Sequence, residues 1–275
     1  MVSQLFGDIA SLWAKYGSVY INGMLSTLAL AVTATLIGCV IGFICGILQT
    51  IPCSPQDSLL KRALLKLIRI IIRIYVEVFR GTPMILQAVF IYYGVPFFTG
   101  NAFKSIWAVS IIVVSINTGA YMAESVRGGI MSVDPGQTEG AKAIGMNHFQ
   151  TMLYVILPQT LRNIMPQIGN NYIINVKDTS VMFIIGFAEF FSVHKMVSGA
   201  VFKYFPSATI EMVGYLSMTL LASFILRYVE RKLAGPENFE LLSADQLVMT
   251  AGTYNSPAKG TPFDEHSREY SGGKK

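Results

Sequence analysis

The longest uncharged stretch of the chain is the feature that most limits what it can fold into. Residues 16–56 contain no Asp, Glu, Lys or Arg, and most of them are apolar. About 20 consecutive apolar residues are enough for a helix to cross the hydrocarbon core of a bilayer. An uncharged stretch of this length predicts a membrane-spanning segment, and with it an integral membrane protein.

The composition supports the same class of protein. Of the 275 residues, 52% are hydrophobic and 13% are charged, whereas soluble domains carry about 25% charged residues. So few charges cannot cover a water-exposed surface, which argues against a cytosolic enzyme, a nucleic-acid-binding protein and a disordered chain. The net charge of +5 does not indicate nucleic acid, because Lys and Arg lie at the ends of apolar segments, as expected for topology control.

The pattern of apolar residues predicts three parts. Residues 1–17 have helical apolar spacing with aromatic anchors, which predicts an amphipathic helix in the membrane interface. Residues 18–232 are expected to form an all-α transmembrane domain. Its five predicted spans lie at about 19–49, 61–98, 103–122, 158–190 and 208–228. The remaining residues 233–275 are polar and predict a largely disordered tail.

The distribution of Lys and Arg predicts the orientation of these spans. Residues 50–66, residues 127–162 and the tail hold more basic side chains than the loops on the opposite side. Cytoplasmic loops carry an excess of Lys and Arg. We therefore expect the N-terminus outside and the C-terminus in the cytosol.

One charged stripe at helical spacing runs along residues 61–80. Its members are Arg62, Lys66, Arg69, Arg73, Glu77 and Arg80. Glu77 is expected to pair with Arg73 and Arg80 on the same helix face. Two interpretations stay open: the stripe anchors a helix to anionic headgroups, or its deep end at Glu77 and Arg80 faces a water-filled path.

The fourth predicted span is interrupted by Lys177-Asp178-Thr179-Ser180. Charged residues inside a membrane cost a few kcal/mol and need partners or a function. One interpretation is that Lys177 and Asp178 neutralise each other or pair with a neighbouring helix. The other is that the four residues line a polar path. Asn117, Tyr121 and Glu124 share one side of the third predicted span and offer a second polar face.

Cysteines and histidines give no sign of a metal or catalytic centre. Cys39, Cys45 and Cys53 show no CxxC or Cys/His spacing, so we expect small buried side chains rather than a disulfide framework or a zinc site. An intramembrane enzyme would need a base such as His148 or His194. Neither has an evident nucleophile partner, and we expect exposed or helix-capping histidines, with His194 in an external loop.

Several motifs, in order along about residues 18–232, resemble the permeases of ABC importers. Glu139-Gly140-Ala141, three further residues and Gly145, followed by Ile156-Leu157-Pro158, has the spacing of their EAA loop. Other motifs resemble the polar amino acid uptake subfamily: Phe79-Arg80-Gly81-Thr82-Pro83, Tyr121-Met122-Ala123-Glu124, Arg127-Gly128-Gly129-Ile130, Gly136-Gln137 and Lys177-Asp178-Thr179-Ser180. The chain is thus similar to a type I importer permease.

The resemblance implies a five-helix core with cytosolic coupling helices in the bacterial cytoplasmic membrane. It also implies three partners: a second permease subunit, identical or related, an ATP-binding cassette ATPase dimer and an extracytoplasmic amino-acid-binding protein. No G-x-x-x-x-G-K-[ST] phosphate loop occurs in these 275 residues. ATP and Mg²⁺ would therefore be bound by the ATPase, and this chain is expected to be a transport subunit without a cofactor, not an enzyme.

The coupling loop implied by the resemblance covers about residues 132–158. Contact with the ATPase would fall on Asp134, Glu139, Gly140, Ala141 and Gly145. Gly145 would provide a tight turn at which a side chain would obstruct packing. Gly140 stands where the family commonly has Ala, and Gly lowers helix propensity by up to about 1 kcal/mol.

The function implied by the resemblance is translocation of a polar or charged amino acid by alternating access. The candidate pathway residues are Arg80, Thr82, Gln87, Asn117, Tyr121, Glu124, Lys177, Asp178, Thr179 and Ser180. A substrate carboxylate could meet Arg80 or helix-end amides, and an ammonium could meet Glu124. The alternative is an ion-coupled secondary transporter with Lys177, Asp178 and Glu124 as a relay, although no inverted halves are evident.

Overall fold

The computed structural model describes residues 2–234, and the side chains of residues 3–232. Within this range every regular element is helical. The long helices are α1 (Val2–Thr50), α2 (Leu59–Gly81), α5 (Ile106–Met131), α8 (Leu157–Asp178) and α10 (Tyr204–Ala234). The short ones are α3 (Met84–Val89), α4 (Val95–Thr99), α6 (Pro135–Ala143), α7 (His148–Gln150) and α9 (Phe190–Val201). The expected tail lies almost entirely outside the described residues.

Three irregular turns connect these helices. Two are π-helical, over Phe90–Gly94 and Thr151–Ile156. The third is a 3-10 segment, Thr179–Ile185, which continues α8 beyond Asp178. It ends at Gly186, whose φ of 83° is left-handed, a conformation that glycine adopts without steric cost.

Three described helices are long and apolar enough to cross a membrane: Ser3–Thr50, Ile106–Met131 and Tyr204–Lys232. A fourth span results if His148–Ile185 and Phe190–Val201, which are bent by 54°, are taken together. The remaining predicted span, 61–98, is divided between α2 and α3–α4. With 23 residues, α2 is about 35 Å long, which is enough to cross a membrane. It is not among the apolar helices named above because it carries the stripe of charged residues.

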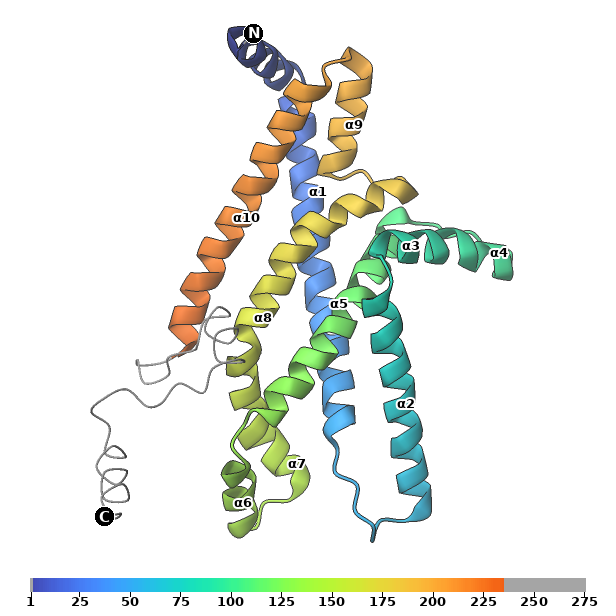
Figure 1. The fold of residues 1–275 in the computed structure, drawn as a ribbon, viewed down its shortest axis with the longest axis vertical. Helices are drawn as coiled ribbons and strands as arrows, with labels where there is room; N and C mark the ends of the chain where they lie inside the picture. The colour runs from blue at the N-terminus through green and yellow to red at the C-terminus, as the bar shows by residue number, and fades with distance from the viewer. Residues whose placement is uncertain (1, 235–275) are drawn as a thin grey trace, which may run out of the picture. The chain divides into compact units, whose positions relative to one another are not determined.

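The first helix continues through the boundary expected at residue 17. Figure 1 shows the first turns of α1, in dark blue, lying at an angle to the rest of the helix. Leu12 and Tyr20 are buried in a cluster with residues of α9 and α10 such as Phe190 and Ile210. One continuous helix therefore covers the boundary expected at residue 17, and the interfacial position of residues 1–17 stays a prediction.

A stripe of three glycines brings α1 into close contact with α5. A Cβ added at Gly38 would lie 2.7 Å from Thr118 Cβ, and one added at Gly46 would lie 2.7 Å from Val126 Cβ. Gly42, between them, meets Met122 in the same way. Small residues allow membrane helices to approach closely enough for van der Waals packing of their backbones.

Buried polar side chains connect this pair of helices to α8. The Asn175 amide of α8 donates to Thr35 Oγ1 of α1 at 2.8 Å and to Thr118 Oγ1 of α5 at 2.9 Å. All three residues are buried. Apolar side chains gain little free energy when they leave lipid for a contact between helices. Interhelical hydrogen bonds of this kind therefore help to hold membrane helices together.

The two ends of the bundle carry different elements (Figure 1). One end holds α6, α7 and the loop between α1 and α2, and the other holds the start of α1, α9 and the turn into α10. In the α1–α2 loop, Lys61 donates to Asp57 Oδ1 at 2.8 Å and the Ser54 N–H donates to Oδ2. These contacts lower the pKa of the Asp57 carboxyl group and fix the chain just before α2.

Candidate translocation site and coupling loop

Arg80 at the end of α2 forms an ion pair with Glu124 of α5. The two side chains are 40% and 43% exposed, so the pair remains accessible to a polar solute. The Arg80 guanidinium also lies over the Tyr121 ring, 5.3 Å from its centroid. Arg80, Tyr121 and Glu124, all expected pathway residues, are therefore brought together by two different helices.

The Arg80–Glu124 pair lines the first of two adjoining cavities. The first, of about 410 Å³, is lined by residues that include Arg80, Tyr121, Glu124 and Asn171. The second, of about 260 Å³, shares Tyr121 and Asn171 with the first. Its lining also contains expected pathway residues: Thr82, Asn117 and Asp178. Six of the ten expected pathway residues thus line one connected polar region between α2, α5 and α8.

Behind the second cavity, two amide side chains brace the break after α2. The buried Gln87 donates to Thr82 Oγ1 and to the Phe79 carbonyl oxygen, both at 2.9 Å. Asn117 donates to Gln87 Oε1 at 3.0 Å and to the same Phe79 carbonyl at 3.1 Å. Gln87 therefore contributes by holding Thr82 and Asn117, which themselves line the cavity.

The other expected residues of the interrupted span lie outside these linings. Lys177 is exposed, Ser180 is half-buried, and the buried Thr179 donates to the Val176 carbonyl at 3.1 Å. Within the described part of the chain, no ion pair shorter than 4.0 Å joins Lys177 to Asp178. Of these two side chains, Asp178 alone lines the second cavity.

A third cavity, of about 420 Å³, adjoins the first at Glu124 and extends along α2. It is lined by Gln49, Arg69, Arg73, Val76, Glu77, Glu124 and Arg127. The predicted pairing of Glu77 with Arg73 and Arg80 is wrong, because Arg80 turns to Glu124 on α5. The deep part of the charged stripe thus faces a polar space between helices, as one of the two interpretations proposed.

The coupling loop forms two short helices joined by a turn. Asp134 caps α6, accepting the Gly136 N–H at 2.7 Å, and α6 continues unbroken through Gly140. Ala141 is buried, whereas Glu139 and Gly140 are exposed. A capping box of Asn147 and Gln150 begins α7. Each expected residue is therefore placed on α6 or at one of its ends.

Gly145 lies in the turn between α6 and α7 with a φ of 85°. No heavy atom lies within 4 Å of a Cβ added there. The expected reason for glycine, obstruction of packing by a side chain, is therefore wrong. The left-handed backbone is what favours glycine, because an L side chain there costs about 1–2 kcal/mol.

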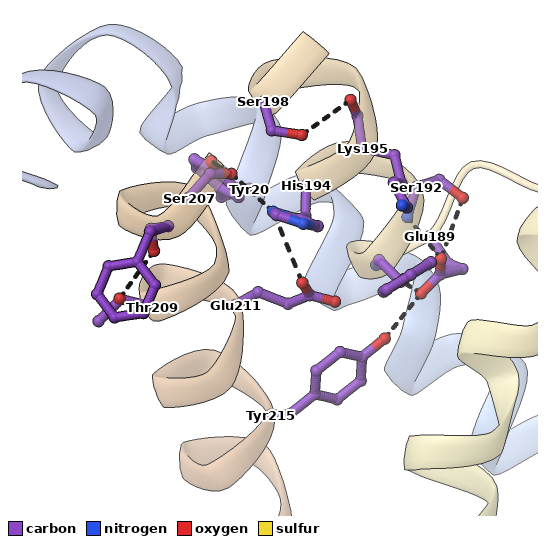
Figure 2. Close-up of polar contacts among 12 residues, drawn as sticks. Tyr20, Glu189, Ser192, His194, Lys195, Ser198, Ser207, Thr209, Glu211 and Tyr215 are labelled. Carbon is purple, nitrogen blue, oxygen red and sulfur yellow. Dashed lines mark hydrogen bonds and ion pairs between the residues drawn. The ribbon is translucent and has the colours of Figure 1, made fainter. Parts of the chain in front are cut away.

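The sequence reasoning missed a buried polar cluster at the end of the bundle where α10 begins (Figure 2). His194 Nδ1 lies 2.9 Å from Ser207 Oγ and 3.7 Å from Glu211 Oε2. The prediction of an exposed or capping His194 in an external loop is wrong, since it lies on α9 and is 1% exposed. Glu189, 0% exposed, and Tyr215 complete the cluster. Glu189 and Glu211 could have been noticed as isolated charges inside apolar segments.

The remaining candidate groups carry no site. Cys39 and Cys45 are half-buried, but Cys53 is exposed because it lies in the α1–α2 loop, so burial was wrongly predicted for it. Among the residues that the structure describes, no group of three His, Cys, Asp or Glu side chains could hold a metal ion.

Comparison of the sequence with known proteins identifies the family of the chain. A family model described as "binding-protein-dependent transport system inner membrane component" matches residues 58–235. The glutamine transport system permease protein GlnP of Escherichia coli K12 is 37% identical over 160 residues, 58% of this chain and 73% of that protein. The arginine transport system permease protein ArtQ of Bacillus subtilis 168 is 31% identical over 213 residues, 78% of this chain and 91% of that protein.

The solved structures that resemble this chain also come from ABC transporters. A chain described as part of an amino acid ABC transporter with histidines is 33% identical, with a TM-score of 0.69, and the match covers 80% of this chain and 96% of that chain. An inward-facing methionine ABC transporter, 18% identical with a TM-score of 0.65 over 80% of this chain and 98% of its own, supports the fold alone. Nothing among the matches supports a secondary transporter. The predicted all-α importer-permease fold is confirmed, and the chain belongs to the family of binding-protein-dependent transport system inner membrane components.

Proposed function

We propose that this chain is the permease subunit through which an ATP-driven importer carries a polar or charged amino acid into the cytoplasm. The observation that carries the proposal is the accessible Arg80–Glu124 pair, which lies on the wall of adjoining polar cavities in a permease fold. Alternating access would expose these cavities to one side of the membrane and then to the other. Relatives named for glutamine and arginine transport support an amino acid as substrate.

The charges of the site suit a zwitterion. A substrate carboxylate can accept hydrogen bonds from the Arg80 guanidinium, and a substrate ammonium can donate to Glu124. Because these two side chains pair with each other, substrate binding would exchange one ion pair for two. That exchange keeps every charge partnered, which a low-dielectric surrounding requires.

The α6–α7 loop would transmit ATP binding to the cavities. Ile144 and Phe149, in and next to its turn, are 77% and 71% exposed, and apolar side chains of this kind form the centres of protein interfaces. We propose that the loop docks on an ATPase dimer, which binds ATP and Mg²⁺. ATP can shift the access equilibrium only by binding the two states with different affinity.

The other partners and the orientation follow from the same proposal. A second permease subunit would complete the pathway, and an extracytoplasmic binding protein would deliver the substrate. The α6–α7 end would face the cytosol and the N-terminus the outside of a bacterial inner membrane, which the excess of Lys and Arg in residues 50–66 and 127–162 supports.

Reconstitution in proteoliposomes with the ATPase and the binding protein tests the function. We expect uptake of labelled glutamine or arginine that requires ATP, and stimulation of ATP hydrolysis by the loaded binding protein. Uptake that is driven by an ion gradient and needs no ATPase would overturn the proposal in favour of the secondary transporter. Uptake of neither amino acid, with hydrolysis stimulated by a different solute, would reject an amino acid as substrate.

A further inference from the structure

Glu189 is a fully buried carboxylate between the 3-10 segment Thr179–Ile185 and α9. Its side chain is 0% exposed, and among the described residues no cationic group lies within 4.0 Å of it. A buried carboxylate is costly unless hydrogen-bond donors replace the lost water. The structure therefore has to stabilise this group by neutral donors alone.

Donors from three helices surround the carboxylate (Figure 2). Oε2 accepts from the Phe191 N–H at 2.8 Å, from Tyr215 of α10 at 2.9 Å and from Thr27 of α1 at 3.4 Å. Oε1 accepts from the Ser192 N–H at 2.7 Å. Two of these donors are N–H groups in the first turn of α9, where the helix dipole favours negative charge.

A second set of contacts connects this carboxylate to the 3-10 segment. Ser192 Oγ lies 3.0 Å from Glu189 Oε1 and 2.6 Å from the Phe187 carbonyl oxygen. The Phe187 N–H in turn donates to the carbonyl of Met182 at 3.2 Å. Met182 is buried within the segment that follows Asp178. The carboxylate thus fixes Ser192 through its backbone N–H, and the single hydrogen of the Ser192 hydroxyl is donated to the Phe187 carbonyl next to the 3-10 segment. Donors of α1 and α10 hold the carboxylate itself.

We propose that Glu189 is a positioning residue for transport, which keeps Asp178 at the wall of the substrate cavity by fixing the 3-10 segment. The inference rests on the proposed pathway, because Asp178 lines the second cavity together with Thr82 and Asn117. Between Asp178 and Glu189 the chain contains one 3-10 segment, the left-handed Gly186, and the two residues Phe187 and Ala188. A displacement of the Glu189 backbone is therefore expected to displace Asp178 as well.

A purely stabilising role makes a different prediction, and the chain offers a matched control. Tyr20 and Ser207 form a buried hydrogen bond of 2.7 Å in the same region, between α1 and α10. This bond makes no contact with the 3-10 segment. Tyr20→Phe therefore removes a comparable buried interaction without releasing the segment.

The test compares Glu189→Gln with Tyr20→Phe in the complete complex, reconstituted with ATPase and binding protein. In Glu189→Gln an NH₂ group replaces one acceptor oxygen and faces an N–H donor of α9, so the junction loosens. We expect both variants to lower thermal stability. Glu189→Gln should raise the KM for uptake about tenfold, which corresponds to about 1.4 kcal/mol, while Tyr20→Phe should keep KM within about twofold of the wild type.

Tyr215→Phe keeps the test decisive if Glu189→Gln does not assemble. It removes one of the donors to Oε2 and leaves the α9 cap intact, and it should raise KM about threefold. A wild-type KM in the assembling variants, or an equal KM change in Tyr20→Phe, would overturn the inference. If Asp178→Asn leaves KM unchanged while Glu189→Gln raises it, the Asp178 step fails. Absence of ATP-dependent uptake in the wild type would reject the proposed function instead.

Discussion

Arg80 of α2 and Glu124 of α5 are 44 positions apart in the sequence, yet they pair at the point where the polar cavities adjoin. Neither residue pairs with a charged neighbour on its own helix, although Glu77 lies one turn before Arg80. Both side chains remain about two-fifths exposed. The pair is therefore a place where a solute with two opposite charges can compete with an existing contact.

Glu124→Gln should lower kcat/KM for uptake at least about tenfold, because a neutral amide replaces the acceptor of a substrate ammonium and of Arg80. ATP-dependent uptake in proteoliposomes measures this change. Glu230→Gln on α10, outside the cavity linings, is the control and should transport normally. Wild-type uptake and unchanged selectivity in Glu124→Gln would remove Glu124 from the substrate site.

Arg73→Gln combined with Arg127→Gln should slow uptake about threefold or more, because the cavity beyond Glu124 would lose two of its three guanidinium groups. The loss should be larger for an acidic amino acid than for a cationic one, as competition experiments can measure. Arg62→Gln on the same stripe lies outside this cavity and is the matched control. Equal losses for acidic and cationic substrates would show that these arginines do not act through charge.

Gly145→Ala should weaken coupling between ATP hydrolysis and uptake, because alanine destabilises the left-handed turn by about 1–2 kcal/mol. Gly199→Ala on α9, with no atom within 4 Å of the added Cβ, lies outside the coupling loop and should couple normally. The number of substrate molecules imported per ATP hydrolysed is the measurement. The hypothesis fails if the two variants lose coupling to the same extent.

Gly42→Val should reduce the folded, membrane-inserted yield strongly, because its side chain would overlap Met122 of α5. Overpacking of a tight contact costs about 1–3 kcal/mol or more. Gly7→Ala on the same helix meets nothing within 4 Å and should leave the yield unchanged. Size-exclusion profiles and thermal unfolding of the detergent-solubilised variants check both expectations, and a normal Gly42→Val profile would contradict the tight seam.

The sequence predicted most of the helices and the grouping of Asn117, Tyr121 and Glu124, because apolar periodicity and the side of a helix are local properties. It did not predict the partner of Arg80, since neighbours on the same helix and neighbours on another helix satisfy a charge equally well. The burial of His194 was missed for a related reason. Its partners Ser207 and Glu211 lie on α10, and a contact between two different helices leaves no trace in the residue spacing along either one.

The need for glycine at 145 was predicted, but for the wrong reason. A short loop motif identifies where the chain must turn, whereas whether the turn is crowded or left-handed depends on its backbone angles. Glu189 shows the opposite case. One carboxylate in an apolar stretch was visible in the sequence, but its surroundings depend on three helices that meet around it.

The close seam between α1 and α5 constrains how access can alternate. Gly38, Gly42 and Gly46 hold one face of α5 against α1, while Asn117, Tyr121 and Glu124 stand on another face of the same helix. Two helices packed this closely are expected to move as one rigid body, since neither can rotate without steric clashes at the three glycines. The α5 wall of the cavity would then move during the transport cycle only together with α1.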